Sequence, residues 1–296
     1  MDSYDEKNLL NIENDRNEEN NIMNLFEKGE LLARGMEPAI LNKDYRTGKI
    51  YYDYSGVSGE LNEAKANGKD TASTSLLILG NRMNTYKANG FLIDSNKTDI
   101  VHISLTDSGS FGGGNDFHES GESLSSLQEL VETSNSGDYN PMNEINVNMR
   151  AEAYRGIFTS TSKYNVAQGI IMQKIAERML QRKLPIFQYD SMHGKLTDSQ
   201  LSKEDKISII KQCIEEQKLR TNEIQYEIDG QMFGFDILEE LGKENNQSIL
   251  DSVEETIEKG TRTGKVNEQA QAMKARQQEK MNPDIEKDNS NKSLDD

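Results

Sequence analysis

Hydrophobic positions in the central part of the chain repeat at two different spacings. Short extended runs bounded by Gly, Pro, Asn or Asp predict strands at residues 29–35, 48–54, 91–93, 100–104, 145–149 and 156–159. Between them, residues 123–131 place their leucines and Val131 at helical spacing. The Gly- and Ser-rich stretches at 55–59 and 108–125 predict long loops. Residues from about 30 to 160 are therefore expected to be rich in strands and loops.

The pattern changes in the last third of the chain. One apolar stripe predicts a long helix that ends near Lys183 and Pro185; it consists of Val166, Ile170, Ile171, Ile175, Met179 and Leu180. Ser202 and Asp205 have the spacing of a capping box that opens a second helix, with Ile207, Ile210 and Ile214 on its buried side. Alternation over 224–228 ends at Asp229-Gly230, a hairpin signal. We therefore expect an α+β fold with a mainly helical C-terminal extension.

The composition predicts a disordered segment at each end of the chain. Hydrophobic residues make up only 34% of the chain, below the roughly 45–50% of an average soluble domain. The first 24 residues are rich in Asn, Asp and Glu, and the last 30 or so hold almost nothing large and apolar. Such segments bury too little surface to offset the entropy of ordering. The expected organisation is a disordered acidic tail at 1–24, a core at 25–163, a helical extension at 164–260 and a disordered polar tail at 261–296.

The charge balance excludes one class of partner. The chain has 51 acidic and 34 basic residues, a formal net charge of −17, which argues against a surface-wide grip on nucleic acid. No apolar run reaches the roughly 18 residues that a membrane span needs, and the acidic start does not resemble a signal peptide. The single cysteine, Cys213, has no internal disulfide partner. We expect a soluble protein of a reducing compartment.

Metal and nucleophile motifs give little support to an enzyme of those classes. The three histidines, His102, His118 and His193, show no HxxH or HExxH spacing, so no metal is expected. No nucleophile elbow, Walker loop or kinase motif occurs. The run at 110–115 (Ser-Phe-Gly-Gly-Gly-Asn) has the composition of a phosphate-binding nest, but a flexible loop is the simpler interpretation.

A more informative set of residues is spread over three predicted strands. Arg34 ends the strand Leu-Leu-Ala-Arg-Gly-Met, where Gly35 would let a ligand approach the backbone. Ser73-Thr74-Ser75 follows about 40 residues later, and Glu144 stands at the start of a strictly alternating strand. Taken singly, these are ordinary features: a surface charge, turn chemistry and an acid at a strand end.

In this order and at this spacing, the three segments resemble the Arg–Ser–Glu class of mono-ADP-ribosyltransferases of the bacterial effector and toxin type. That family has an Arg at a strand end, often before Gly-Met, then a Ser-Thr-Ser strand leading to a short helix. It then has a Glu that is usually preceded two positions earlier by Glu or Gln. The resemblance covers about residues 29–160. It implies a split β-sandwich core and the transfer of ADP-ribose from NAD+ to a host protein acceptor. It also implies delivery from the bacterial cytoplasm into a host cell without a cleavable signal peptide.

The resemblance also implies a role for each residue. Glu144 would stabilise the oxocarbenium-like ribose that forms as nicotinamide leaves, and Ser73 would orient that carboxylate. Arg34 would hold the diphosphate through bidentate, charge-assisted hydrogen bonds. NAD+ would contact Gly35, Thr74 and Ser75 as well. Tyr86 and Phe91 are alternative aromatic faces for the nicotinamide.

Two departures from the family pattern leave alternatives open. Met142 stands two residues before Glu144, where the family has Glu or Gln, so an arginine acceptor is not implied. The Gly- and Ser-rich segment 104–140 is a candidate acceptor-recognition loop. A rival serine motif, residues 159–162 (Thr-Ser-Thr-Ser), would need its acid from 188–190 or from Glu223 or Glu227. Because no Glu-x-Glu lies there, the assignment to Ser73 is preferred.

Two other functional classes fit parts of the sequence. A macrodomain-like ADP-ribose hydrolase would use the triple glycine Gly112–Gly114 for the diphosphate and Asp107 or Asp116 to activate water. A catalytically inactive effector would act as a protein-binding module through its helical part and tails. The acidic tails and the missing second glutamate favour that alternative.

Overall fold

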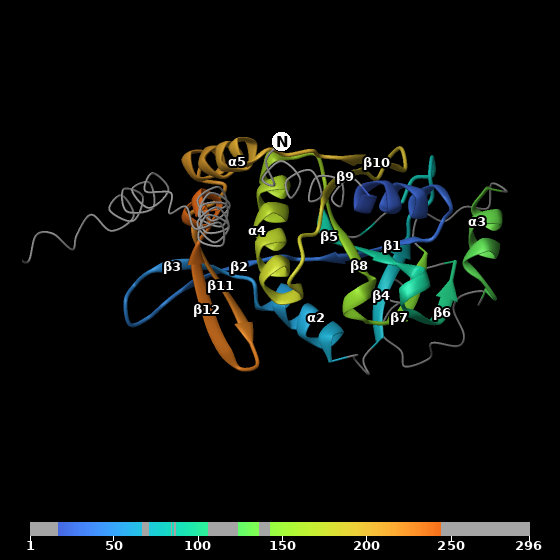
Figure 1. The fold of residues 1–296 in the computed structure, drawn as a ribbon, viewed down its shortest axis with the longest axis horizontal. Helices are drawn as coiled ribbons and strands as arrows, with labels where there is room; N and C mark the ends of the chain where they lie inside the picture. Colours follow the sequence, from blue (N-terminus) through green and yellow to red (C-terminus); the bar gives the residue numbers. More distant parts are fainter. Residues whose placement is uncertain are drawn as a thin grey trace, which may run out of the picture. The chain divides into compact units, whose positions relative to one another are not determined.

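The computed structural model describes residues 17–66, 71–83, 85, 87–105, 124–135 and 143–243. These residues form two mixed β-sheets, with helices packed against them (Figure 1). The mixed α+β class predicted from the hydrophobic pattern is therefore confirmed.

The larger sheet has eight strands in the order β10-β9-β8-β5-β1-β4-β7-β6. Their bounds are β1 Leu31–Met36, β4 Thr71–Leu76, β5 Asn89–Asp94, β6 Asp99–Ser104, β7 Glu144–Asn148, β8 Tyr154–Thr159, β9 Ile186–Asp190 and β10 Lys195–Asp198. Neighbours are antiparallel except β8 and β9, which are parallel and joined through a helix.

The smaller sheet has the order β12-β11-β3-β2. It consists of β2 Ile40–Lys43, β3 Ile50–Asp53, β11 Glu223–Ile228 and β12 Gln231–Asp236, and β3 pairs with β11 in parallel. The turn between β11 and β12 has positive φ at both Asp229 (50°) and Gly230 (78°). Two positive φ values are the signature of a type I′ hairpin, so the Asp-Gly prediction is confirmed.

The labelled helices are α2 Ser55–Lys65, α3 Leu127–Asn135, α4 Lys163–Leu180 and α5 Lys203–Glu215. Residues 17–27 and 237–243 are also helical. Two short 3-10 helices are η1 Ser95–Lys97 and η3 Ala151–Ala153. The long helix α4 packs on β5, β8 and β9 of the large sheet and also contacts α2 and α5 (Figure 1). Within the described part of the chain, no helix is long and apolar enough to cross a membrane.

The capping box at the start of α5 is confirmed. The Ser202 hydroxyl accepts from the Asp205 amide at 3.1 Å, and the Asp205 carboxylate accepts from the Ser202 amide at 3.1 Å. The helix buries Ile210 and Cys213, whereas Ile207 and Ile214 are only partly covered. Mutual capping of this kind satisfies two backbone donors that a helix start leaves open.

The predicted loop at 55–59 is wrong, because these residues begin α2. Gly56 and Gly59 are poor helix formers, but Val57, Leu61 and Ala64 recur at helical spacing and are fully buried. Packing of that apolar face overrides local propensity.

The predicted disordered tail at 1–24 is too long. Residues 17–27 form a helix whose Ile22, Leu25 and Phe26 are buried against Leu31, Ala33 and the large sheet. Three large apolar side chains on one helical face supply the burial that a disordered tail lacks. Residues 1–16 lie outside the described part of the chain.

Residues 164–243 are mainly helical, as predicted, but residue 163 does not separate a core from an extension. Strands β9 and β10 extend the large sheet beside β8, and β11 and β12 complete the small sheet beside β3. Residues as far as Leu241 belong to one compact unit. The rest of the predicted extension, 244–260, and the predicted tail at 261–296 lie outside the described residues.

Candidate functional site

The three segments singled out in the sequence lie on three adjacent strands. Arg34 is on β1, Ser73, Thr74 and Ser75 are on the neighbouring β4, and Glu144 begins β7 on the far side of β4. Segments up to 110 residues apart in sequence are therefore brought into one region of the large sheet.

The strands β1 and β4 separate at Arg34. Their pairing stops at Ala33 opposite Ser75. Beyond that point a side-chain hydrogen bond replaces the backbone pairing: the Arg34 Nη1 donates to the Ser73 carbonyl oxygen at 3.0 Å. No described residue accepts a hydrogen bond from Nη2, and the side chain remains 29% exposed.

Arg34 is held by an acid that the sequence interpretation missed. Its Nε donates to both carboxylate oxygens of Glu60 on α2, at 3.0 and 3.2 Å. The Tyr154 hydroxyl donates to the same carboxylate at 3.1 Å. Burial, followed by the charge of Glu60, raises the pKa of Tyr154 well above its usual range, so the hydroxyl keeps its proton. The side chain of Glu60 is 6% exposed, which makes this a largely buried ionic network.

The sheet places Arg34 and Glu144 on opposite faces. Ala33 pairs with Ser75, and Ser73 pairs with Asn146. Because paired residues share a face and neighbours along a strand alternate, Ser73, Ser75 and Glu144 point to one face. Arg34 and Thr74 point to the other, toward α2 and Tyr154. Arg34 is thus hydrogen-bonded to the Ser73 carbonyl, whereas the side chains of Ser73 and Ser75 lie on the same face of the sheet as Glu144.

Ser75 is better placed than Ser73 to meet Glu144. The register of β4 with β7 pairs Ser73 with Asn146 and Thr74 with Ile145, and its continuation sets Ser75 across from Glu144. On its other side Glu144 pairs with Ser104 of β6. Glu144 is 7% exposed, as is Ser75, whereas Ser73 is exposed.

Two side chains fix the strands around Glu144. Asn143 accepts from the Leu76 amide at 2.7 Å and donates to the Leu76 carbonyl at 3.2 Å, so its amide group replaces a backbone pairing. Thr74 donates from its hydroxyl to the Ile145 carbonyl at 2.7 Å. Both residues flanking Glu144 in sequence are therefore tied to β4.

Replacing Asn143 with Ala should destabilise the protein by about 1–3 kcal/mol, because the buried Leu76 peptide loses both partners. Urea unfolding monitored by circular dichroism measures this change. The matched variant Asn24→Ala, on the exposed side of the helix at 17–27, should change stability by less than about 0.5 kcal/mol. Equal effects from the two variants would show that Asn143 does not hold β4.

Other residues implied by the family resemblance have different surroundings. A Cβ added at Gly35 would lie 2.3 Å from the Thr85 carbonyl oxygen, so the chain itself fills the space on that side. Phe91 is fully buried and packs edge-on against Tyr154, with ring centroids 5.1 Å apart, so its face is not open to a nicotinamide. Tyr86 lies outside the described residues.

The rival serine motif has a structural use. Thr159 ends β8, and Ser162 is the N-cap of α4, where its hydroxyl accepts from the Asn165 amide at 3.2 Å. The Ser160 hydroxyl accepts from the Asn165 side chain at 2.6 Å. Of the acids that would accompany this motif, Glu223 is 3.7 Å from Lys49 in the small sheet.

Several predicted positions lie outside the described residues, namely Met142, Asp107, Gly112–Gly114, Asp116 and His118. Within the candidate recognition loop 104–140, residues 106–123 and 136–140 also lie outside the described residues, whereas Leu127–Asn135 form α3. The recognition role of this segment and the hydrolase alternative therefore stay predictions. Among the residues that are described, no cluster of three or more His, Cys, Asp or Glu side chains could hold a metal ion.

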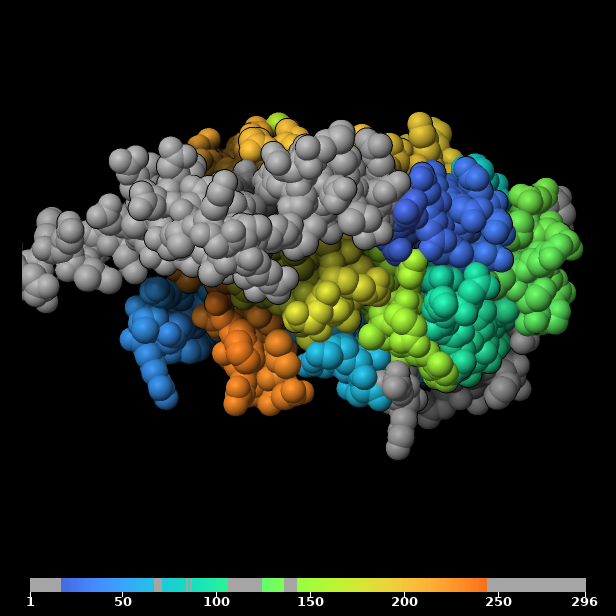
Figure 2. All heavy atoms as spheres, viewed as in Figure 1, coloured from blue at the N-terminus to red at the C-terminus, as the bar shows by residue number. Residues whose placement is uncertain are grey.

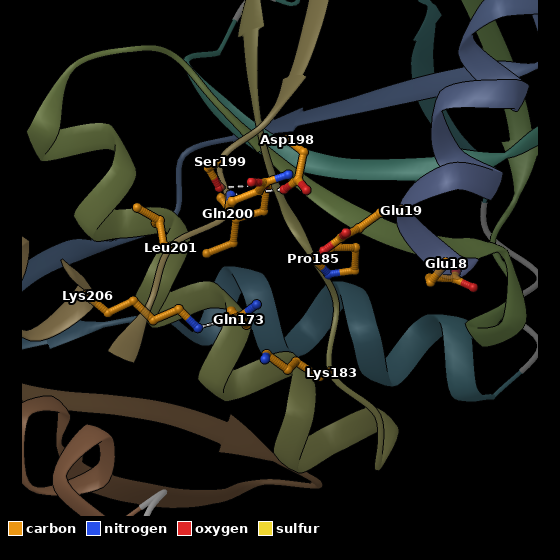
Figure 3. Close-up of a pocket in the computed structure, with 11 residues that line it drawn as sticks. Glu18, Glu19, Gln173, Lys183, Pro185, Asp198, Ser199, Gln200, Leu201 and Lys206 are labelled. Atoms are coloured by element: carbon orange, nitrogen blue, oxygen red, sulfur yellow. Dashed lines mark hydrogen bonds between the residues drawn. The ribbon is translucent and has the colours of Figure 1, made fainter. Parts of the chain in front are cut away.

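A pocket of about 90 Å³ lies elsewhere, where α4, α5 and the β9–β10 end of the large sheet meet (Figure 3). Two buried polar residues, Gln173 and Lys206, line it. The Lys206 ammonium donates to the Gln173 side chain at 2.6 Å, and Gln173 in turn donates to the Leu184 carbonyl. None of the catalytic or cofactor-binding residues predicted from the sequence lines this pocket. Its buried polar groups tie α5 to α4 and to the segment before β9.

The sequence held a signal for Glu60 that the loop prediction at 55–59 obscured. Val57, Leu61 and Ala64 mark a buried helical face, and Glu60 lies on that face as its one acid. A carboxylate on a buried face requires a cationic or hydrogen-bonding partner.

Neither the protein-family models nor the curated protein sequences compared with the chain match it.

Proposed function

We propose that the chain transfers ADP-ribose from NAD+ to a protein acceptor. The observation that carries the proposal is the grouping of Ser73, Ser75 and Glu144 on one face of β4 and β7, with Arg34 bound to the Ser73 peptide on the next strand. Residues of these types in this order are what the transferase resemblance requires.

Glu144 is the group that stabilises charge in this mechanism. Loss of nicotinamide from NAD+ leaves a ribose with oxocarbenium character, and a fixed carboxylate beside it lowers the barrier. Glu144 is nearly buried and is flanked by two residues anchored to β4. Such a carboxylate needs little reorganisation when positive charge develops.

The serines orient that carboxylate and the ribose. Ser75, across from Glu144 in the continued register, takes the orienting role, and the exposed Ser73 is free to meet the sugar hydroxyls. This division of roles differs from the sequence-based prediction, which gave Ser73 the orienting role.

Arg34 retains donors for an anionic ligand. Of its five N–H groups, the one on Nε faces Glu60 and one on Nη1 faces Ser73, which leaves the pair on Nη2 and one on Nη1. They lie on the face of the sheet opposite Glu144, so they would bind an anionic group there and not the diphosphate of an NAD+ molecule whose ribose meets Glu144. The acceptor in this proposal is a host protein, reached by a secreted bacterial effector.

The test incubates the full chain with labelled NAD+ and a host-cell lysate. Wild-type protein should label at least one lysate protein, and Ser73→Ala/Ser75→Ala should label it roughly tenfold to 100-fold more slowly, because the carboxylate loses its orientation. Ser160→Ala is the matched control and should retain wild-type labelling. If Ser160→Ala is the defective variant instead, the site assignment is wrong.

A second candidate, a catalytically inactive protein-binding module, is favoured by one observation. Arg34 faces α2 and pairs with Glu60, on the side of the sheet opposite Glu144. In that case wild-type protein consumes no NAD+ with any lysate, and its effect on host cells survives Glu144→Ala.

A further inference from the structure

The hairpin formed by β2 and β3 carries an unusual surface for this chain. Its turn extends beyond the other two strands of the small sheet and projects from the surface in Figure 2 (lower left, blue). Tyr45 at its tip is 98% exposed, and Ile40 on β2 is 65% exposed. Ile50 on β3 adds a third exposed apolar side chain. The register of β2 with β3 puts Ile40 and Ile50 on opposite faces, so the hairpin presents an exposed apolar side chain on each face.

The turn that presents Tyr45 is well ordered by hydrogen bonds. The Asp44 carboxylate accepts from the Arg46 amide at 2.8 Å, the Thr47 amide at 3.4 Å and the Thr47 hydroxyl at 2.7 Å. Gly48 has a φ of 72°, and its amide donates to the Asp44 carbonyl at 2.7 Å. The hydrogen bonds that Asp44 accepts from Thr47 and Arg46 lower its pKa, so the carboxylate stays ionised and keeps these hydrogen bonds.

The hairpin is basic within a strongly acidic chain. Residues 40–53 contain Lys43, Arg46 and Lys49 against Asp44 and Asp53, a net charge of +1, whereas the whole chain carries −17. Lys49 is 3.7 Å from Glu223. Lys43 and Arg46 form no ion pair with any described residue and are exposed.

These cations border a surface groove of about 460 Å³, to which Tyr45 and Tyr51 also contribute. That volume is in the range of ligand clefts, roughly 300–1,000 Å³. Strand β2 of this hairpin is one of the two edge strands of the small sheet, so its free edge offers backbone donors and acceptors.

We infer that the β2–β3 hairpin is the docking surface for an extended acidic segment of a partner protein. The segment adds to the β2 edge through backbone hydrogen bonds, its carboxylates meet Lys43 and Arg46, and its apolar side chains cover Ile40 and Tyr45. The free edge of β2 and the exposed Ile40 favour a peptide over nucleic acid or an anionic membrane, because neither of those can add a strand. A second copy of the same basic hairpin is disfavoured by like charge. The inference does not depend on the transferase proposal.

Selection from a random 12-residue peptide display library on the immobilised full chain tests this inference. The selected peptides should be enriched in Asp and Glu alternating with apolar residues. A labelled peptide of the selected consensus should bind at least about tenfold more weakly to Lys43→Glu/Arg46→Glu, and more weakly to wild type at high salt. The matched control, Arg82→Glu/Lys97→Glu, makes the same change in net charge at exposed positions outside the hairpin and should bind like wild type.

Three outcomes would overturn the inference. One is a selected pool without acidic enrichment, including a pool with no enrichment at all. Another is equal binding of the consensus peptide to the hairpin variant and to wild type. The third is hairpin-dependent binding of a single-stranded DNA 20-mer or of phosphatidylserine vesicles that exceeds peptide binding, which would assign the surface to a different class of partner.

Discussion

Glu144→Gln is expected to slow the transfer of ADP-ribose by about 100- to 1,000-fold, the cost of removing one preorganised charge-stabilising group. The substitution keeps the shape of the side chain and one acceptor oxygen, replaces the other oxygen with an NH2 donor, and removes the negative charge that faces the developing oxocarbenium. Binding of NAD+ should change little, because the charge acts mainly in the transition state. Single-turnover labelling with a fixed acceptor separates the two effects.

A matched substitution makes the result interpretable. Glu63→Gln removes one negative charge from the exposed side of α2 and should leave the rate unchanged. Thermal unfolding of both variants shows whether the fold is kept. A correctly folded Glu144→Gln variant with wild-type transfer rates would remove Glu144 from the mechanism.

Glu60→Ala is expected to lower the free energy of unfolding by about 2–4 kcal/mol. The substitution strips Arg34 of its acid and Tyr154 of its acceptor, and the loss of one partner of a buried ion pair leaves the other uncompensated. The partial exposure of Arg34 keeps the expected loss at the lower end for such pairs. Urea unfolding should show a lower midpoint with an unchanged slope.

A double-mutant cycle of Glu60→Gln with Tyr154→Phe tests whether the network acts as a unit. Residues that share hydrogen bonds should show a coupling free energy of about 0.5–3 kcal/mol, whereas independent residues would give a coupling near zero. Purely additive losses would mean that the hydrogen bond from Tyr154 to Glu60 adds nothing to the stability that each residue provides by itself.

Sequence patterns predicted the local elements well where a short-range cause exists. The capping box, the Asp-Gly turn and the apolar stripe of α4 depend on residues within a few positions of one another. The helix α2 was missed because glycine and serine indicate a loop, and only distant packing partners for Val57 and Leu61 reverse that preference.

The candidate site was predictable only as a list of segments. Their residue types pointed to three strands, and the sheet order makes those strands neighbours. Which face each side chain takes depends on register, and a shift of one residue moves a side chain to the other face. Arg34 therefore faces Glu60 rather than Glu144, a fact that spacing along the chain does not contain.

The parallel pairing of β3 with β11 has a consequence for how the chain is made. Residues 50–53 emerge from the ribosome long before their partners at 223–228, so the small sheet cannot close until residues 223–228 have been synthesised. Until then the apolar side chain of Tyr52 and the edge of β3 lack their cover, and contacts this far apart in sequence form slowly. A nascent chain with this topology therefore exposes these groups to chaperones over a long interval of its synthesis.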